Sequence, residues 1–171
     1  MIETLTLSPR VTLRCFRDTR FKQGRLTVQF VRPMSKEEAS LNALLPAVLL
    51  RGTEKHPDLR SITMYLDDLY GAAVGDMVRR IGDYQTTGLQ MRFISDRYAM
   101  DGDKILEPAI DFLGQLLFDP LLENGVFSKS FVSGEKRNLI AAIEAKAAEI
   151  GKEAYAAPYA AYDITKIWEE Q

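Results

Sequence analysis

The chain has 171 residues, a formal net charge of -2 and a hydrophobic fraction of 46%. This length fits one domain with a packed core, and the weak negative charge argues against a nucleic-acid or anionic-membrane partner. No apolar run approaches the roughly 20 residues that span a bilayer. The N-terminus lacks a basic stretch followed by an apolar core, so no secretion signal is predicted.

Two stretches near the N-terminus alternate apolar and polar residues. VTLRCFR, residues 11–17, and RLTVQFVR, residues 25–32, have the period of half-buried strands. We expect them to form an antiparallel pair joined by residues 18–24. Cys15, the only cysteine, falls in the first strand and is predicted to be a buried structural thiol, which favours a reducing cytoplasm.

The next segment reads as a buried helix. Ser35 and Glu38 have the spacing of a capping box at its start. The apolar residues of LNALLPAVLL are distributed nearly all round the helix, so we expect it to be buried on most sides. Pro46 lies in its interior and predicts a kink, and Gly52 predicts its end.

The remaining pattern predicts two further strands and three further helices. Asp58 is a candidate N-cap for a helix over residues 59–69. Strands are predicted near residues 73–79 and 85–94, and helices over residues 105–117 and 128–150. The order strand–strand–helix–helix–strand–strand–helix–helix predicts an α+β domain, a largely antiparallel sheet with helices packed on one face. In residues 154–171, Pro158 interrupts an alanine-rich helical pattern.

Four segments in this order resemble the core of a peptidase family. They are LNALLPAVLLRGT (41–53), SITMYLDDLYG (61–71), FLGQLLFDPLL (112–122) and EKRNLIAAI (135–143). Together they resemble the insulinase/pitrilysin-like zinc peptidases, the inverzincins, whose first helix carries His-x-x-Glu-His, two zinc-binding histidines and a general base. Carried over by position, the histidines become Ala43 and Ala47, the base becomes Pro46, and a distant third ligand becomes Ala142 or Ala141. The resemblance implies a domain without catalytic or metal-binding residues.

The resemblance also implies partners. It is closest to a bacterial cytoplasmic subgroup in which a subunit lacking the zinc motif is encoded beside an active-looking sister. It therefore implies a partner or scaffold subunit with no cofactor of its own, zinc being expected only in the sister, and a link to modification of elongation factor P. Since the family builds its working unit from two or more such domains, residues 1–171 are expected to be one insulinase-like domain, the N-terminal part of a longer protein, that pairs with a homologous subunit or second domain.

Two other functions remain open. One is a zinc-dependent endopeptidase whose catalytic residues lie outside this chain, and the other is a stand-alone peptide-binding module. In the family, substrate adds as a strand to a sheet edge beside the metal. The residues that match this edge strand are Ala73, Val74, Gly75, Asp76 and Met77. They are expected to hold an extended peptide or a partner domain, or to form a plain structural edge.

Other residues capable of chemistry are interpreted as structural. His56, the only histidine, lies in a turn and is expected to be solvated rather than to bind metal. Glu135, Glu144 and the adjacent pair Asp67 and Asp68 are expected to be surface charge. No Gly-x-Ser-x-Gly turn or phosphate-binding loop occurs.

Overall fold

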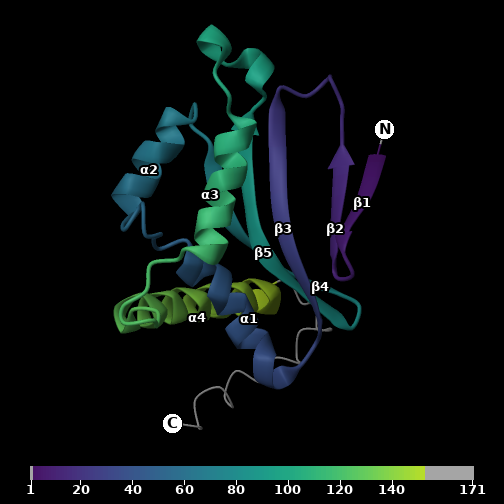
Figure 1. Ribbon diagram of the computed structural model, residues 1–171. Helices are drawn as coiled ribbons and strands as arrows, with labels where there is room; N and C mark the ends of the chain where they lie inside the picture. The colour runs from purple at the N-terminus through teal and green to yellow at the C-terminus, as the bar shows by residue number, and fades with distance from the viewer. Residues whose placement is uncertain (1, 153–171) are drawn as a thin grey trace.

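The computed structural model describes residues 2–152, and its elements confirm the predicted α+β class (Figure 1). All the strand pairs among the described residues are antiparallel. The tail pattern of residues 154–171 lies outside the described residues. The elements are β1 (Ile2–Ser8), β2 (Val11–Phe16), β3 (Gln23–Pro33), α1 (Lys36–Leu49), α2 (Leu59–Asp68), β4 (Ala73–Ile81), β5 (Tyr84–Ile94), the 3-10 turns Asp96–Tyr98 and Met100–Gly102, α3 (Leu106–Phe118) and α4 (Lys129–Lys152).

The strands of the described residues form two separate sheets rather than one. β1 pairs with β2 in a two-stranded hairpin, and the other three strands form a sheet of order β3-β5-β4. The predicted pairing of residues 11–17 with 25–32 is therefore wrong, and β1 was not predicted. Residues 2–8 reach β2 through the short turn at Pro9, so closing this hairpin costs less chain entropy than closing one across residues 18–24. β3 instead pairs along its whole length with β5, from Gln23 opposite Ile94 to Pro33 opposite Tyr84.

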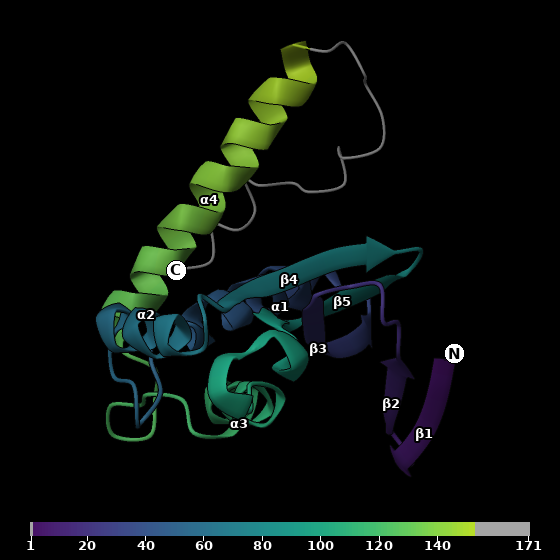
Figure 2. The same ribbon diagram turned by 90° about the horizontal axis from the view of Figure 1, so that it is seen from above.

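The core lies between the three-stranded sheet and α3, which covers one face of that sheet (Figures 1 and 2). Alternate residues of the central strand β5 point to this side, where Leu89, Met91 and Phe93 are buried. The apolar stripe of α3 packs against them through Ala109, Phe112, Leu113 and Leu116. The helix predicted over residues 105–117 is confirmed.

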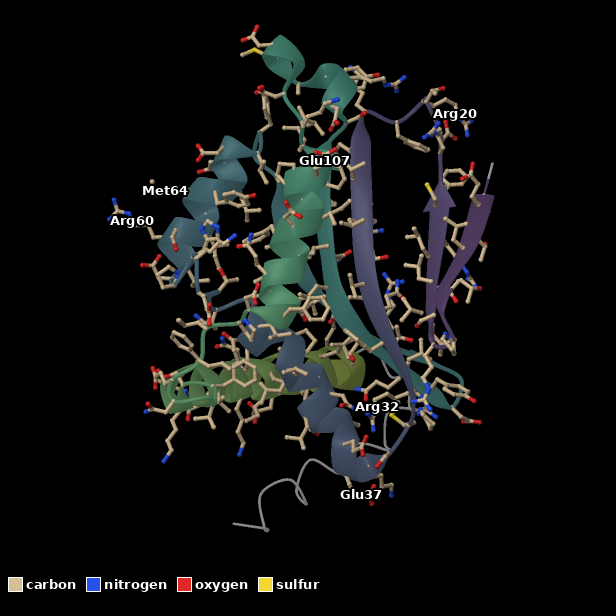
Figure 3. All side chains as sticks on the ribbon, in the orientation of Figure 1. Arg20, Arg32, Glu37, Arg60, Met64 and Glu107 are labelled. Atoms are coloured by element: carbon tan, nitrogen blue, oxygen red, sulfur yellow. The ribbon has the colours of Figure 1, made fainter. Side chains whose placement is uncertain are left out.

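Helix α1 starts and packs differently from the prediction. Ser35 is its N-cap residue but makes no side-chain capping bond, since its hydroxyl donates to the Glu37 carboxylate. Glu38 pairs with Arg32 at the end of β3, so the predicted capping box is wrong. Figure 3 labels Arg32 and Glu37 at the start of α1. Leu41 and Leu45 are 67% and 47% exposed, which corrects the expectation that the helix is buried on most sides.

Two acidic side chains cap the other helices of the core. Asp58 accepts from the Ser61 amide and forms a capping box with that residue, which confirms the predicted cap of α2. Asp96 accepts from the amides of Ile105 and Leu106 at 3.0 Å each and so caps α3 from the preceding 3-10 turn. Helix α4 contacts α1, and Figure 2 shows it extending away from the sheet.

Candidate functional site

The positions that match the zinc motif lie on α1 and α4, two helices in contact with each other. On α1, Ala43 and Ala47 are half-buried and Pro46 is buried inside the helix. On α4, Ala142 is exposed. Zinc in proteins is held by thiolate, imidazole or carboxylate groups, and none of these four side chains has such a group. The residues at these positions therefore do not fit the metal or the general base that the motif supplies.

No other metal site replaces it among the described residues. Within that part of the chain, no group of three or more His, Cys, Asp or Glu side chains lies close enough to hold an ion. Glu144, Asp67 and Asp68 are exposed, as expected for surface charge.

His56 is not the solvated turn residue that the sequence predicts. Its ring lies 4.6 Å from that of Tyr65 and 5.7 Å, edge to face, from that of Phe112, measured between centroids. Phe112 is fully buried, and burial raises the pKa of the Tyr65 hydroxyl. The half-buried imidazole thus packs as a core aromatic group. This interpretation corrects the solvated assignment and keeps the conclusion that His56 is structural.

Glu135, predicted to be surface charge, pairs with Arg51 at the end of the α1 segment. The two side chains are only 12% and 27% exposed, so the ion pair is largely shielded from water. It ties the Arg51-Gly52-Thr53 motif directly to α4. Both residues lie inside segments of the same resemblance, but no local sequence pattern in either segment points to the other.

The Arg51-Gly52-Thr53 motif is also joined to the end of α3. The Leu121 amide donates to the Gly52 carbonyl at 3.0 Å, and the Glu54 amide donates to the Asp119 carbonyl at 3.1 Å. A side chain at Gly52 would meet the Pro57 carbonyl oxygen at 3.0 Å, so only glycine fits without adjustment. Thr53 is fully buried and accepts from the His56 amide. This junction holds α1 against α3 and α4.

The predicted peptide-binding segment, Ala73 to Met77, lies on β4 at an edge of the three-stranded sheet. Of the described strands, only β5 pairs with β4. Ala73 and Asp76 are exposed, Val74 and Gly75 are half-buried, and Met77 is buried. Backbone groups on the free side of an edge strand are available to another strand.

The hairpin β1–β2 presents a second surface. Every residue of both strands is exposed. Leu5 and Leu13 are cross-strand partners, and Leu7 and Val11 continue the same face, each at 44% exposure or more. Cys15 is also exposed, so the predicted buried thiol is wrong. The reason is that the hairpin stands apart from the core, which a strand pattern alone does not reveal.

Comparisons with known proteins support a non-catalytic, metallopeptidase-like chain. Over 135 residues, 79% of its length, it is 33% identical to a Bacillus subtilis (strain 168) protein named "Probable inactive metalloprotease YmfF". It is also similar in fold to a conserved protein of Enterococcus faecalis V583, with a TM-score of 0.79, 27% identity and 84% of this chain covered. No family model matches.

The chain spans about a third of each of these two relatives, 32% of the first and 34% of the second. Among its described residues, no helix is both long and apolar enough to cross a membrane.

Proposed function

We propose that this chain is a cytoplasmic, non-catalytic homologue of the insulinase-type zinc peptidases and acts as a partner or scaffold subunit for an active sister. The proposal rests on one observation. The helices that carry the motif positions pack together, but those positions hold no residue that binds zinc or transfers a proton. Helices α1 and α4 still pack together, and the Arg51–Glu135 pair joins them. The four positions that match the catalytic motif carry alanine or proline, which neither bind zinc nor move a proton.

The exposed hairpin β1–β2 supports a partner role. A single two-stranded hairpin is marginally stable in water, and contiguous exposed apolar surface is typical of interaction sites. The hairpin β1–β2 is a two-stranded sheet of this kind, and its exposed apolar surface is the face formed by Leu5, Leu7, Val11 and Leu13. A second domain of similar fold that covers this face would bury its leucine side chains and hold the hairpin in place.

The outer edge of β4, with which no other described strand pairs, supports a binding role that does not need catalysis. An extended peptide, or a strand of a partner, bonds to such an edge through main-chain groups alone. Loss of the zinc motif would leave this mode of binding intact. The scaffold could therefore hold a peptide beside an active site that the sister supplies.

Metal analysis and copurification together test the proposal. We expect the purified chain to bind no stoichiometric zinc and to cleave no peptide, and to copurify with a coexpressed homologue that carries His-x-x-Glu-His. The exposed Cys15 thiol reports on the hairpin, because a partner that covers β1–β2 would slow its reaction with a maleimide.

Other outcomes favour the alternatives. Stoichiometric zinc, with cleavage that a chelator abolishes, would overturn the proposal in favour of an endopeptidase. Peptide binding without any partner would favour a stand-alone module. The link to elongation factor P rests on the resemblance alone, and deletion of the gene followed by mass spectrometry of that factor would test it.

A further inference from the structure

We infer that the start of β4 selects a carboxylate on an extended peptide, a specificity that rests on the proposed strand addition at this edge. The selecting group is Arg92, on the neighbouring strand. Ala73 of β4, Arg92 of β5 and Arg25 of β3 are consecutive cross-strand partners and form one row across the sheet, here called the Ala73 row.

The sheet face that carries this row is basic. Residues directly opposite one another in an antiparallel sheet point to the same side, and the side alternates along each strand. The face with Arg25 and Arg92 is therefore the one away from the buried Leu89, Met91 and Phe93, and it also carries Arg79. All three arginines are exposed. None of the residues that the register of β3, β4 and β5 places on this face is Asp or Glu.

Neither arginine of the row has an anionic partner among the residues that the structure describes. The Arg25 guanidinium donates to the Gln90 side-chain oxygen at 2.6 Å, and the Arg92 side chain makes no hydrogen bond or ion pair with any described residue. Like charges directly opposite each other on neighbouring strands destabilise a sheet. A carboxylate bound between the row and an added strand would relieve that repulsion and satisfy free guanidinium donors.

A pocket of about 240 Å³ opens at the same place. Arg92, Ala73, Gly71, Tyr70, Ile94 and Gln23 are among its lining residues. The Tyr70 hydroxyl donates to the Asp103 carboxylate and accepts from the Met100 amide, so it is already occupied. The guanidinium of Arg92 is thus the pocket's free cationic donor among the residues described.

The Ala73 row predicts which residue of an added peptide has its side chain recognised. Neighbouring strands lie about 4.8 Å apart, so a residue added opposite Ala73 lies roughly 10 Å from the Arg92 backbone on the same face. The single methyl group of Ala73 lies between them and leaves room for two longer side chains to meet. A Glu side chain at this position would reach toward Arg92. In an antiparallel addition the C-terminal end of the peptide also lies beside the start of β4, so a terminal carboxylate is a second source of the same group.

Fluorescence polarisation on the full 171-residue chain tests the inference. The probes are fluorescein-labelled seven-residue peptides of alternating Thr and Val with Glu or Gln at the centre, each with an amidated or a free C-terminus. Arg92→Gln removes the selecting charge. Arg79→Gln, which removes an exposed arginine from the other end of the same face, is the matched control.

We expect the Glu peptide to bind the natural chain about threefold to fivefold more tightly than the Gln peptide, the range of a partly exposed ion pair. Arg92→Gln should abolish that ratio and leave the Gln peptide unaffected, and added salt should reduce it. Arg79→Gln should preserve it. A preference confined to free C-termini would assign the pocket to the terminal carboxylate.

Two results would overturn the inference in different ways. Equal binding of the Glu and Gln peptides, whether their C-termini are amidated or free, would show that no carboxylate is selected. Strand addition at β4 would still be supported. Binding of none of the peptides would overturn both the selection and the peptide-binding part of the proposed function, while copurification with a sister would still test the partner role separately.

Discussion

Removal of one partner from the Arg51–Glu135 ion pair should destabilise the protein more than removal of an exposed pair. The two side chains are 27% and 12% exposed, against 55% and 48% for Arg32 and Glu38. Loss of one partner from a fully buried pair costs about 3–5 kcal/mol, because the remaining charge is left without compensation. Exposed pairs contribute roughly 0–1 kcal/mol. The partial burial of Arg51 and Glu135 places Glu135→Ala between these limits, at about 2 kcal/mol.

Urea and thermal denaturation followed by circular dichroism measure this difference. For a chain of this size, 2 kcal/mol lowers Tm by about 4–8 °C. The matched control Arg32→Ala should change the free energy of unfolding by about 0.5 kcal/mol or less. The double variant Arg51→Ala with Glu135→Ala should cost less than the sum of its single variants, since it leaves no unpaired charge.

Equal losses for Glu135→Ala and Arg32→Ala would refute the reasoning that burial sets the strength of this pair. Additive single variants would also refute it, because they would show that Arg51 and Glu135 do not interact. Either result would remove the ion pair as the link between the α1 segment and α4.

Three further predictions concern Gly52, Asp96 and Cys15. Gly52→Ala should lower the free energy of unfolding, measured in urea, by about 1–3 kcal/mol, because its methyl group would press on the Pro57 carbonyl. Gly114→Ala, in α3 with open space around it, should be neutral or stabilising. Equal effects of the two variants would contradict the steric argument. Asp96→Ala should cost about 1 kcal/mol through loss of the α3 cap. Hydrogen bonds from the Leu106 amide and then the Ile105 amide lower the pKa of Asp96 in the folded chain. The stability difference between the natural chain and Asp96→Ala should therefore be complete above the ordinary pKa of 3.8 and shrink as the pH falls through the lower folded-state pKa. A stability difference that does not change with pH would argue against a charged cap. Cys15 should react fully with maleimide in the folded chain, and protection in the isolated chain would contradict its exposed position.

Local sequence patterns predicted most elements because local physics determines them. The alternation in β5, the apolar stripe of α3 and the Asp58 cap of α2 each depend on residues a few positions apart. The capping box predicted at Ser35 is wrong because nearby side chains compete for both of its members, and the Ser35 hydroxyl donates to Glu37 instead of a helix amide. Glu38 has a competing partner in Arg32, on the strand before the helix.

The candidate site divides in the same way. The absence of metal-binding groups at Ala43, Pro46, Ala47 and Ala142 is a matter of residue identity, so the sequence alone establishes it. The partners of Glu135 and His56 come from segments distant in the chain, Arg51 for the first and Phe112 for the second. No periodicity encodes such contacts, because they depend on how helices and loops pack.

By itself, the sequence determined the α+β class, the positions of most helices and strands, and the absence of zinc-binding groups at Ala43, Pro46, Ala47 and Ala142. Only the tertiary structure decided which strands pair, that the β1–β2 hairpin stands exposed, and that Ala73, Arg92 and Arg25 form one row. The physical reason is that strand pairing joins residues far apart in the chain. Which strands pair therefore depends on all the alternative pairings in the fold and not on the pattern of one strand alone.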